Sequence, residues 1–116
     1  MLRRADNAAR RRVHARVFAA LGDATRLALV AKLSGGESCS ISQLTEAAAG
    51  ERMTRQAVAK HLRVLEEVGL VRCARVGRER LYEFRPAPVE EMKEYLEFVS
   101  AKWDEALGRL KAFVEE

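Results

Sequence analysis

The chain has 116 residues, of which 48% are hydrophobic and 33% are charged, and its formal net charge is +4. A chain of this length and composition forms one folded domain, which excludes a largely disordered protein. It contains no apolar run of the roughly 20 residues that span a bilayer, and its basic N-terminus lacks the apolar segment of a secretory signal. We therefore expect a cytoplasmic protein with no membrane partner.

The basic charge is concentrated in two parts of the chain. Residues 1–16 contain six arginines and one aspartate, for a net charge of +5. Residues 52–85 contain nine basic and four acidic residues, again +5, whereas residues 88–116 contain four basic and eight acidic residues, for −4. A segregated basic surface is the electrostatic pattern of a nucleic-acid-binding protein, so double-stranded DNA is the leading candidate partner.

The first third of the chain predicts two helices. A flexible basic arm over residues 1–7 precedes a helix over residues 8–21, in which apolar residues recur on one face. Gly22 ends this helix, and Asp23 is placed as the N-cap of a second helix over residues 24–33.

Residues 41–68 predict a helix-turn-helix unit. Ser40 is the expected cap of a helix over residues 41–49, a turn follows over residues 50–53, and Thr54 is the expected cap of a helix that runs to Val68. Two helices joined by so short a turn are typical of DNA-binding domains, in which the second helix enters the major groove.

The period of the sequence then changes from helical to alternating. Residues 70–84 predict a β-hairpin, a wing, whose turn is at Gly77 and Arg78. The expected fold class is therefore mainly α with a small β-hairpin, a single winged helix-turn-helix domain over residues 1–116 with five helices and a two-stranded wing.

The last predicted helix, residues 88–114, has apolar residues at alternating steps of four and three, the spacing of a coiled-coil seam. At ~1.5 Å per residue it would be ~40 Å long, more than the core of one such domain covers. We expect it to pack with the first helix against a second copy, although packing within one chain is the alternative. The expected dimer interface is Val13, Val17, Met92, Leu96, Val99, Trp103, Leu107 and Leu110.

Nine residues are candidate DNA contacts. Arg55 and Gln56 open the recognition helix, where Arg suits guanine and Gln suits adenine in the major groove. Arg78 at the tip of the wing is expected to enter or flank the minor groove. The remaining candidates, mostly for phosphate contacts, are Thr54, Lys60, His61, Arg63, Arg75 and Arg80.

Some of these candidates have a purely structural alternative. Thr54 is equally explained as a helix cap, and His61 as a residue that hydrogen-bonds a neighbouring backbone group. Arg75 and Arg80 are alternatively ion-pair partners of the nearby Glu79 or Glu83.

Three segments together resemble the ArsR-type family of bacterial winged-helix repressors. They are FAALGDATRLALVAKL in the second-helix region, TRQAVAKHLRVLEEVGLV in the recognition helix and VGRERLYEF in the wing. The resemblance implies a homodimeric transcriptional repressor that binds a pseudo-palindromic operator and releases it when a signal binds.

The chain departs from the family at its metal-sensing positions. Many members bind metals through a Cys-x-Cys pair at the start of the third helix, where this chain has Ser40 and Ser42. Others use Asp and His on the last helix, which here contains no His, and carboxylates alone make a poor transition-metal site. We expect no metal and no cofactor, and the sequence does not identify an inducer.

Two other functions remain as alternatives. Cys39 and Cys73 would serve a thiol-based redox response, and a winged helix is also used as a protein-interaction module that does not bind DNA. An enzyme is not expected, because the chain lacks a nucleophile elbow, a P-loop and a dinucleotide-binding glycine pattern, and so offers no catalytic residues.

Overall fold

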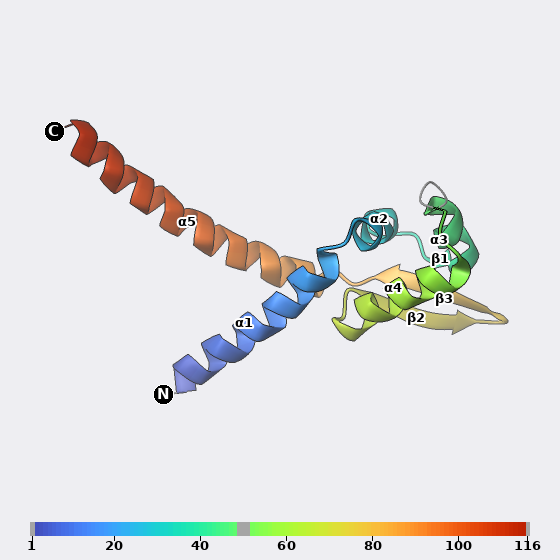
Figure 1. Cartoon of the computed structure of the whole chain (residues 1–116). Coiled ribbons are helices and arrows are strands. Elements are labelled where there is room, and N and C mark those ends of the chain that lie inside the picture. Colours follow the sequence, from blue (N-terminus) through green and yellow to red (C-terminus); the bar gives the residue numbers. More distant parts are fainter. Residues whose placement is uncertain (1, 49–51, 116) are drawn as a thin grey trace.

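The computed structural model describes residues 2–48 and 52–115 and shows a winged helix-turn-helix with two long helices on one side (Figure 1). The elements are α1 (Leu2–Leu21), α2 (Ala24–Leu33), β1 (Cys39–Ser40), α3 (Ile41–Ala47), α4 (Arg55–Glu67), β2 (Val71–Val76), β3 (Glu79–Phe84) and α5 (Ala87–Glu115). The predicted fold class, mainly helical with a small β wing, is confirmed.

The core lies where α2, α3 and α4 meet the sheet. Its fully buried side chains come from the three helices and from the residue before β2, and they are almost all leucines: Leu29, Leu33, Leu44, Val58, Leu62, Leu65 and Leu70. Full burial of one such side chain stabilises the fold by about 1.5–3 kcal/mol. Apolar packing against α2 therefore holds the two helices of the helix-turn-helix in place.

The sheet has three strands rather than the two that we expected. Its order is β1-β3-β2, all antiparallel, and β1 pairs Cys39 with Tyr82 and Ser40 with Leu81. A strand of two residues is too short to show an alternating pattern, so it could not be predicted from periodicity. This strand ties the start of α3 to the wing.

The predicted N-caps are present. The side chains of Asp23 and Thr54 accept hydrogen bonds from backbone amides at 3.0 and 3.1 Å, at the starts of α2 and α4. Ser40 forms a capping box with Gln43 at the start of α3. These caps fix where each helix begins and hence the direction in which its first turn points.

Gly69 explains how the chain leaves α4. Its φ is +78°, and hydrogen bonds from Gly69 N to Glu66 O and from Leu70 N to Leu65 O close a Schellman motif. Because L-residues rarely adopt this conformation, glycine ends the helix here and turns the chain into β2.

Some helix ends differ from the predicted ones. The first helix extends back to Leu2, where we expected a flexible arm, because this segment is rich in Ala and Arg and contains neither Gly nor Pro. The third helix ends at Ala47, and the last spans Ala87–Glu115, one residue longer than predicted at each end. Gly50 and Glu51 of the predicted turn lie outside the described residues.

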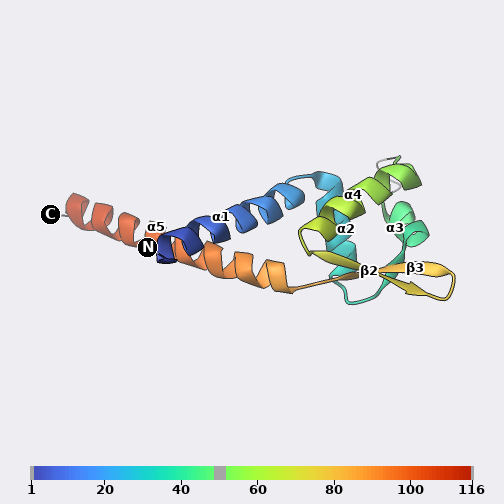
Figure 2. The same cartoon turned by 90° about the horizontal axis from the view of Figure 1, so that it is seen from below.

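The two long helices diverge from the winged domain, which gives the molecule extents of 67 × 37 × 22 Å (Figures 1 and 2). They contact each other where they leave the domain. The centroid of the Tyr95 ring lies 5.4 Å from that of the His14 ring and 6.3 Å from that of the Phe18 ring. Large apolar side chains on α5 are exposed to solvent, namely Leu96, Phe98, Trp103, Leu107, Leu110, Phe113 and Val114. Among the described residues, no helix combines the length and apolar character needed to cross a membrane.

Candidate nucleic-acid interface

Helix α4 has one apolar face and one polar, basic face. Val58, Leu62 and Leu65 are buried in the core. Six residues of α4 are exposed: Arg55, Gln56, Lys60, Arg63, Glu66 and Glu67. We call the first four, which contain all three cations, the basic face of α4. Burial of the apolar stripe thus fixes the rotation of the helix and turns the basic face to solvent.

The N-terminal end of α4 combines a cap with an oriented arginine. Thr54 is exposed, and its hydroxyl accepts the Ala57 amide at 3.1 Å, so the structural role proposed for it is present. A hydrogen bond from the Arg55 guanidinium to the Ser42 hydroxyl joins the start of α4 to α3. The same helix end retains unpaired backbone amides and a positive dipole, which favour an anionic partner.

The wing places two arginines directly opposite each other. In the β2–β3 register Arg75 pairs with Arg80 and Val76 with Glu79, while the cross-strand ion pair is Arg72–Glu83, with 3.4 Å between Nε and Oε1. Among the described residues, neither Arg75 nor Arg80 forms an ion pair. The structure therefore does not support the alternative of ion pairs with Glu79 or Glu83.

The tip of the wing is a two-residue turn. Gly77 has φ +63°, which the first position of a type II′ hairpin turn requires, and the exposed Arg78 follows it. In both views the tip of the hairpin and the N-terminal end of α4 lie at the same end of the molecule, away from the free ends of α1 and α5 (Figures 1 and 2). Both basic elements are thus available to one extended anionic partner.

His61 is placed differently from the other candidates. It is half-buried, and its Nδ1 lies 3.2 Å from Arg26 Nη1 and 3.8 Å from Asp23 Oδ2, both of which belong to the start of α2. Its contact with phosphate therefore stays a prediction that this geometry does not favour. Sequence reasoning did not single out Arg26, although it lies within the segment that resembles the family's second helix.

The positions that carry metal ligands in other family members have structural roles here. Ser40 caps α3, and Ser42 accepts the hydrogen bond from Arg55. In the described part of the chain, no three His, Cys, Asp or Glu side chains are grouped so as to hold a metal ion.

The two cysteines lie on opposite sides of Tyr82, on the strands that flank β3. Cys39 and Cys73 each pair with Tyr82, so their Cα atoms are two strand spacings apart, about 9–10 Å. A disulfide needs Cα atoms within roughly 7 Å. Burial raises the pKa of the Tyr82 phenol, and the adjacent Cys73 thiol adds to this rise. This arrangement gives the redox alternative no support, because the tyrosine side chain separates the two thiols.

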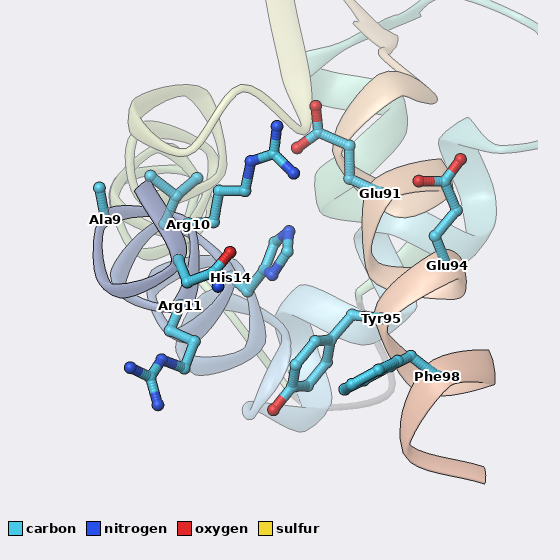
Figure 3. A pocket seen from close by; sticks show the side chains of 10 residues that line it. Ala9, Arg10, Arg11, His14, Glu91, Glu94, Tyr95 and Phe98 are labelled. Carbon is cyan, nitrogen blue, oxygen red and sulfur yellow. The ribbon is translucent and has the colours of Figure 1, made fainter. Parts of the chain in front are cut away.

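A second feature is an open cleft of about 850 Å³ between α1 and α5 (Figure 3). Arg10 and Arg11 line it from α1, whereas Glu91 and Glu94 line it from α5, with His14, Tyr95 and Phe98 between them. Among the described residues no ion pair crosses this cleft, and the Nδ1 atom of His14 is buried without a hydrogen-bond partner. The cleft therefore presents apolar, basic and acidic groups that the single chain leaves unpaired.

Comparisons with known proteins agree with this arrangement. Residues 21–74 match the family model described as a helix-turn-helix domain. The uncharacterized HTH-type transcriptional regulator YuzN of Bacillus subtilis (strain 168) is 38% identical over 79 residues, which cover 66% of this chain and 86% of YuzN.

Two solved structures have the same fold. An ArsR-like transcriptional regulator from Rhodococcus sp. RHA1 is 36% identical with a TM-score of 0.76, and the match covers 93% of this chain and 95% of that one. The ArsR family transcriptional regulator RHA00566 is 28% identical with a TM-score of 0.70, over 80% of this chain and 92% of that one.

The fold and its basic surface define a DNA-binding transcriptional regulator of the winged helix-turn-helix class. The chain belongs to the ArsR family of these regulators. The resemblance that the three sequence segments indicated is thereby confirmed.

The opposed arginines of the wing yield a prediction that separates stability from DNA binding. Arg80→Glu replaces a repulsive cross-strand pair with an attractive one, so we expect the free energy of unfolding to rise by roughly 0.2–1 kcal/mol in urea denaturation. Affinity for duplex DNA should fall at least about tenfold in fluorescence anisotropy, because positive charge near the phosphates is lost.

Lys32→Glu is the matched control, because it makes the same charge change at an exposed position of α2. We expect this variant to bind DNA nearly as well as the wild type. A loss of affinity as large as that of Arg80→Glu would show that net charge, rather than the wing, determines binding.

Proposed function

We propose that the protein is a homodimeric repressor that binds a pseudo-palindromic operator, with one α4 and one wing on each half-site. The observation that carries this proposal is the pair of opposed, unpaired arginines on the wing, at the same end of the molecule as the basic face of α4. Like charges directly opposite each other destabilise a hairpin, and a polyanionic partner removes that cost.

The exposed residues divide into two groups by their expected contacts. Arg55 and Gln56, at the N-terminal end of α4, read base edges in the major groove, and Arg78 enters the minor groove from the tip of the wing. Phosphate contacts come from Thr54, Lys60, Arg63, Arg75 and Arg80. The outward surface is basic rather than apolar or acidic, which argues against a protein-interaction module.

The dimer is supported by the surface that α5 leaves exposed. Trp103, Leu107 and Leu110 are 56–65% exposed, a large apolar surface for a protein to leave in water. A second copy that packs along α5 would cover this surface, and in the cleft between α1 and α5 it would bring its own acidic and basic helices to the unpaired charges. The proposed interface retains Val13, Leu96, Val99, Trp103, Leu107 and Leu110.

Two residues of the expected interface are removed from it. Val17 and Met92 are 3% and 6% exposed and belong to the core of the single chain. The apolar periodicity of the two helices included them because a buried position and an interface position have the same apolar character in sequence. Repression itself rests on the family resemblance: a dimer bound at an operator excludes other proteins from that DNA.

The proposed minor-groove contact of Arg78 and the proposed major-groove contact of Gln56 predict different effects on binding. We expect Arg78→Ala to weaken binding to most sequences and to reduce the slope of log K against log salt concentration by about 1, because one phosphate-proximal charge is lost. Gln56→Ala should instead lower affinity for a selected duplex by roughly tenfold while binding to random DNA changes little. Anisotropy titrations with selected and random duplexes at several salt concentrations measure both effects.

Wild-type binding that does not depend on salt would contradict a DNA function for this surface. If both variants retained wild-type affinity for the selected duplex, α4 and the wing would not be the contact surface.

The proposed dimer is tested at Leu107. Leu107→Asp places a charge on the exposed apolar face of α5, and we expect the protein to become monomeric in sedimentation-velocity experiments. Leu27→Asp is the matched control, because Leu27 is 51% exposed on α2 and Leu107 is 56% exposed on α5. The control should remain dimeric, and a wild type that is monomeric at micromolar concentration would exclude the proposed dimer.

A further inference from the structure

Arg26, in the first turn of α2, is joined by hydrogen bonds to two other helices, α1 and α4. Its backbone amide donates to Asp23 at the start of α2, at 3.0 Å. Its guanidinium donates from Nε to Ala20 O, near the end of α1, and its Nη1 lies 3.2 Å from His61 Nδ1 on α4. One side chain thus links the first long helix, the second helix and the recognition helix.

Each of these contacts is physically well matched. The last carbonyls of α1 lack partners within their own helix and carry the negative end of its dipole, so a guanidinium there is favourable. A further contact from Arg26 Nη2 to Ala19 O, at 3.4 Å, binds the same end of α1. The amide of Arg26 lowers the pKa of the Asp23 carboxyl, which keeps this N-cap ionised beside Arg26 and His61.

His61 is oriented toward α2 by this cluster rather than toward the exposed side of α4. Its side chain is 19% exposed and that of Asp23 is 35% exposed. Because a guanidinium only donates hydrogen bonds, its contact with Nδ1 requires that nitrogen to act as the acceptor. The apolar core beneath α4 sets the rotation of that helix, and this polar contact ties one point along it to the ends of α1 and α2.

We propose that Arg26 and His61 are positioning residues for DNA recognition, which hold α4 at a fixed orientation relative to α1. The proposal rests on the proposed function, in which α1 lies at the dimer interface and α4 on a half-site. In such a dimer the orientation of α4 relative to α1 determines whether both recognition helices fit the major groove at once. Loss of the Arg26–His61 contact therefore reduces specific binding more than nonspecific binding, because base contacts require a fixed register and nonspecific phosphate contacts do not.

The test compares two replacements of His61 in the full-length protein. His61→Asn retains an acceptor close to the position of Nδ1, whereas His61→Leu removes it and keeps an apolar side chain of similar size. We expect His61→Leu to bind a selected duplex about tenfold more weakly while its affinity for a random duplex changes less than about twofold. His61→Asn should restore binding of the selected duplex to within about threefold of the wild type.

A double-mutant cycle examines the link to Arg26. If the two residues act through each other, Arg26→Ala combined with His61→Leu should bind the selected duplex no more than about twofold more weakly than Arg26→Ala alone. Thermal unfolding of each variant confirms that it is folded. Should Arg26→Ala not fold, the comparison of His61→Leu with His61→Asn decides the question by itself.

Three results would overturn the positioning role. One is wild-type specificity in His61→Leu, and another is an equal loss in His61→Asn and His61→Leu. The third is an equal loss of specific and random binding with a salt slope lower by about 1, which identifies His61 as a direct phosphate contact. A wild type that binds no duplex at all would instead reject the proposed function.

Discussion

The burial of one apolar stripe on α4 is the interaction on which the rest of the structure depends. Val58, Leu62 and Leu65 are inaccessible to solvent. Any rotation of α4 about its own axis would move one of these side chains into water, which is unfavourable. The rotation of α4 is therefore fixed by the core. Its basic face points outward as a consequence, because the residues opposite the buried stripe of a surface helix face solvent.

The structure contains features that are unfavourable for an isolated chain. Two arginines face each other across the wing, and seven large apolar side chains on α5 are exposed to solvent. Each becomes favourable with a specific partner, a polyanion for the wing and a second copy for α5. Both features lower the stability of the free chain, and neither contributes to the stability of the core. We therefore interpret them as binding surfaces.

Most of the fold was predictable because its signals are local. The caps at Asp23, Ser40 and Thr54 and the exit at Gly69 are short-range patterns, and the structure has all of them. The two-residue strand at Cys39 was not predictable, because its pairing with Tyr82 is set by tertiary contacts more than 40 positions away in the sequence.

The basic residues of the candidate site could be predicted from the sequence, but the contacts among its side chains could not be predicted. His61 lies at the margin of the buried stripe of α4, and only the structure shows that it faces Arg26 and Asp23. In the same way the apolar periodicity that includes Val17 and Met92 did not reveal that the single chain buries them. Sequence periodicity identifies a helix face, and the packing of distant segments decides what that face contacts.

In the proposed complex, two copies of α4 and of the wing bind one operator together. Hydroxyl-radical footprinting of the wild type on a duplex selected from random DNA tests it most directly. We expect protected segments on both strands, related by a two-fold axis, with half-site centres separated by about 10 base pairs or a multiple of that spacing. Protection of a single half-site, or none on any selected duplex, would contradict it.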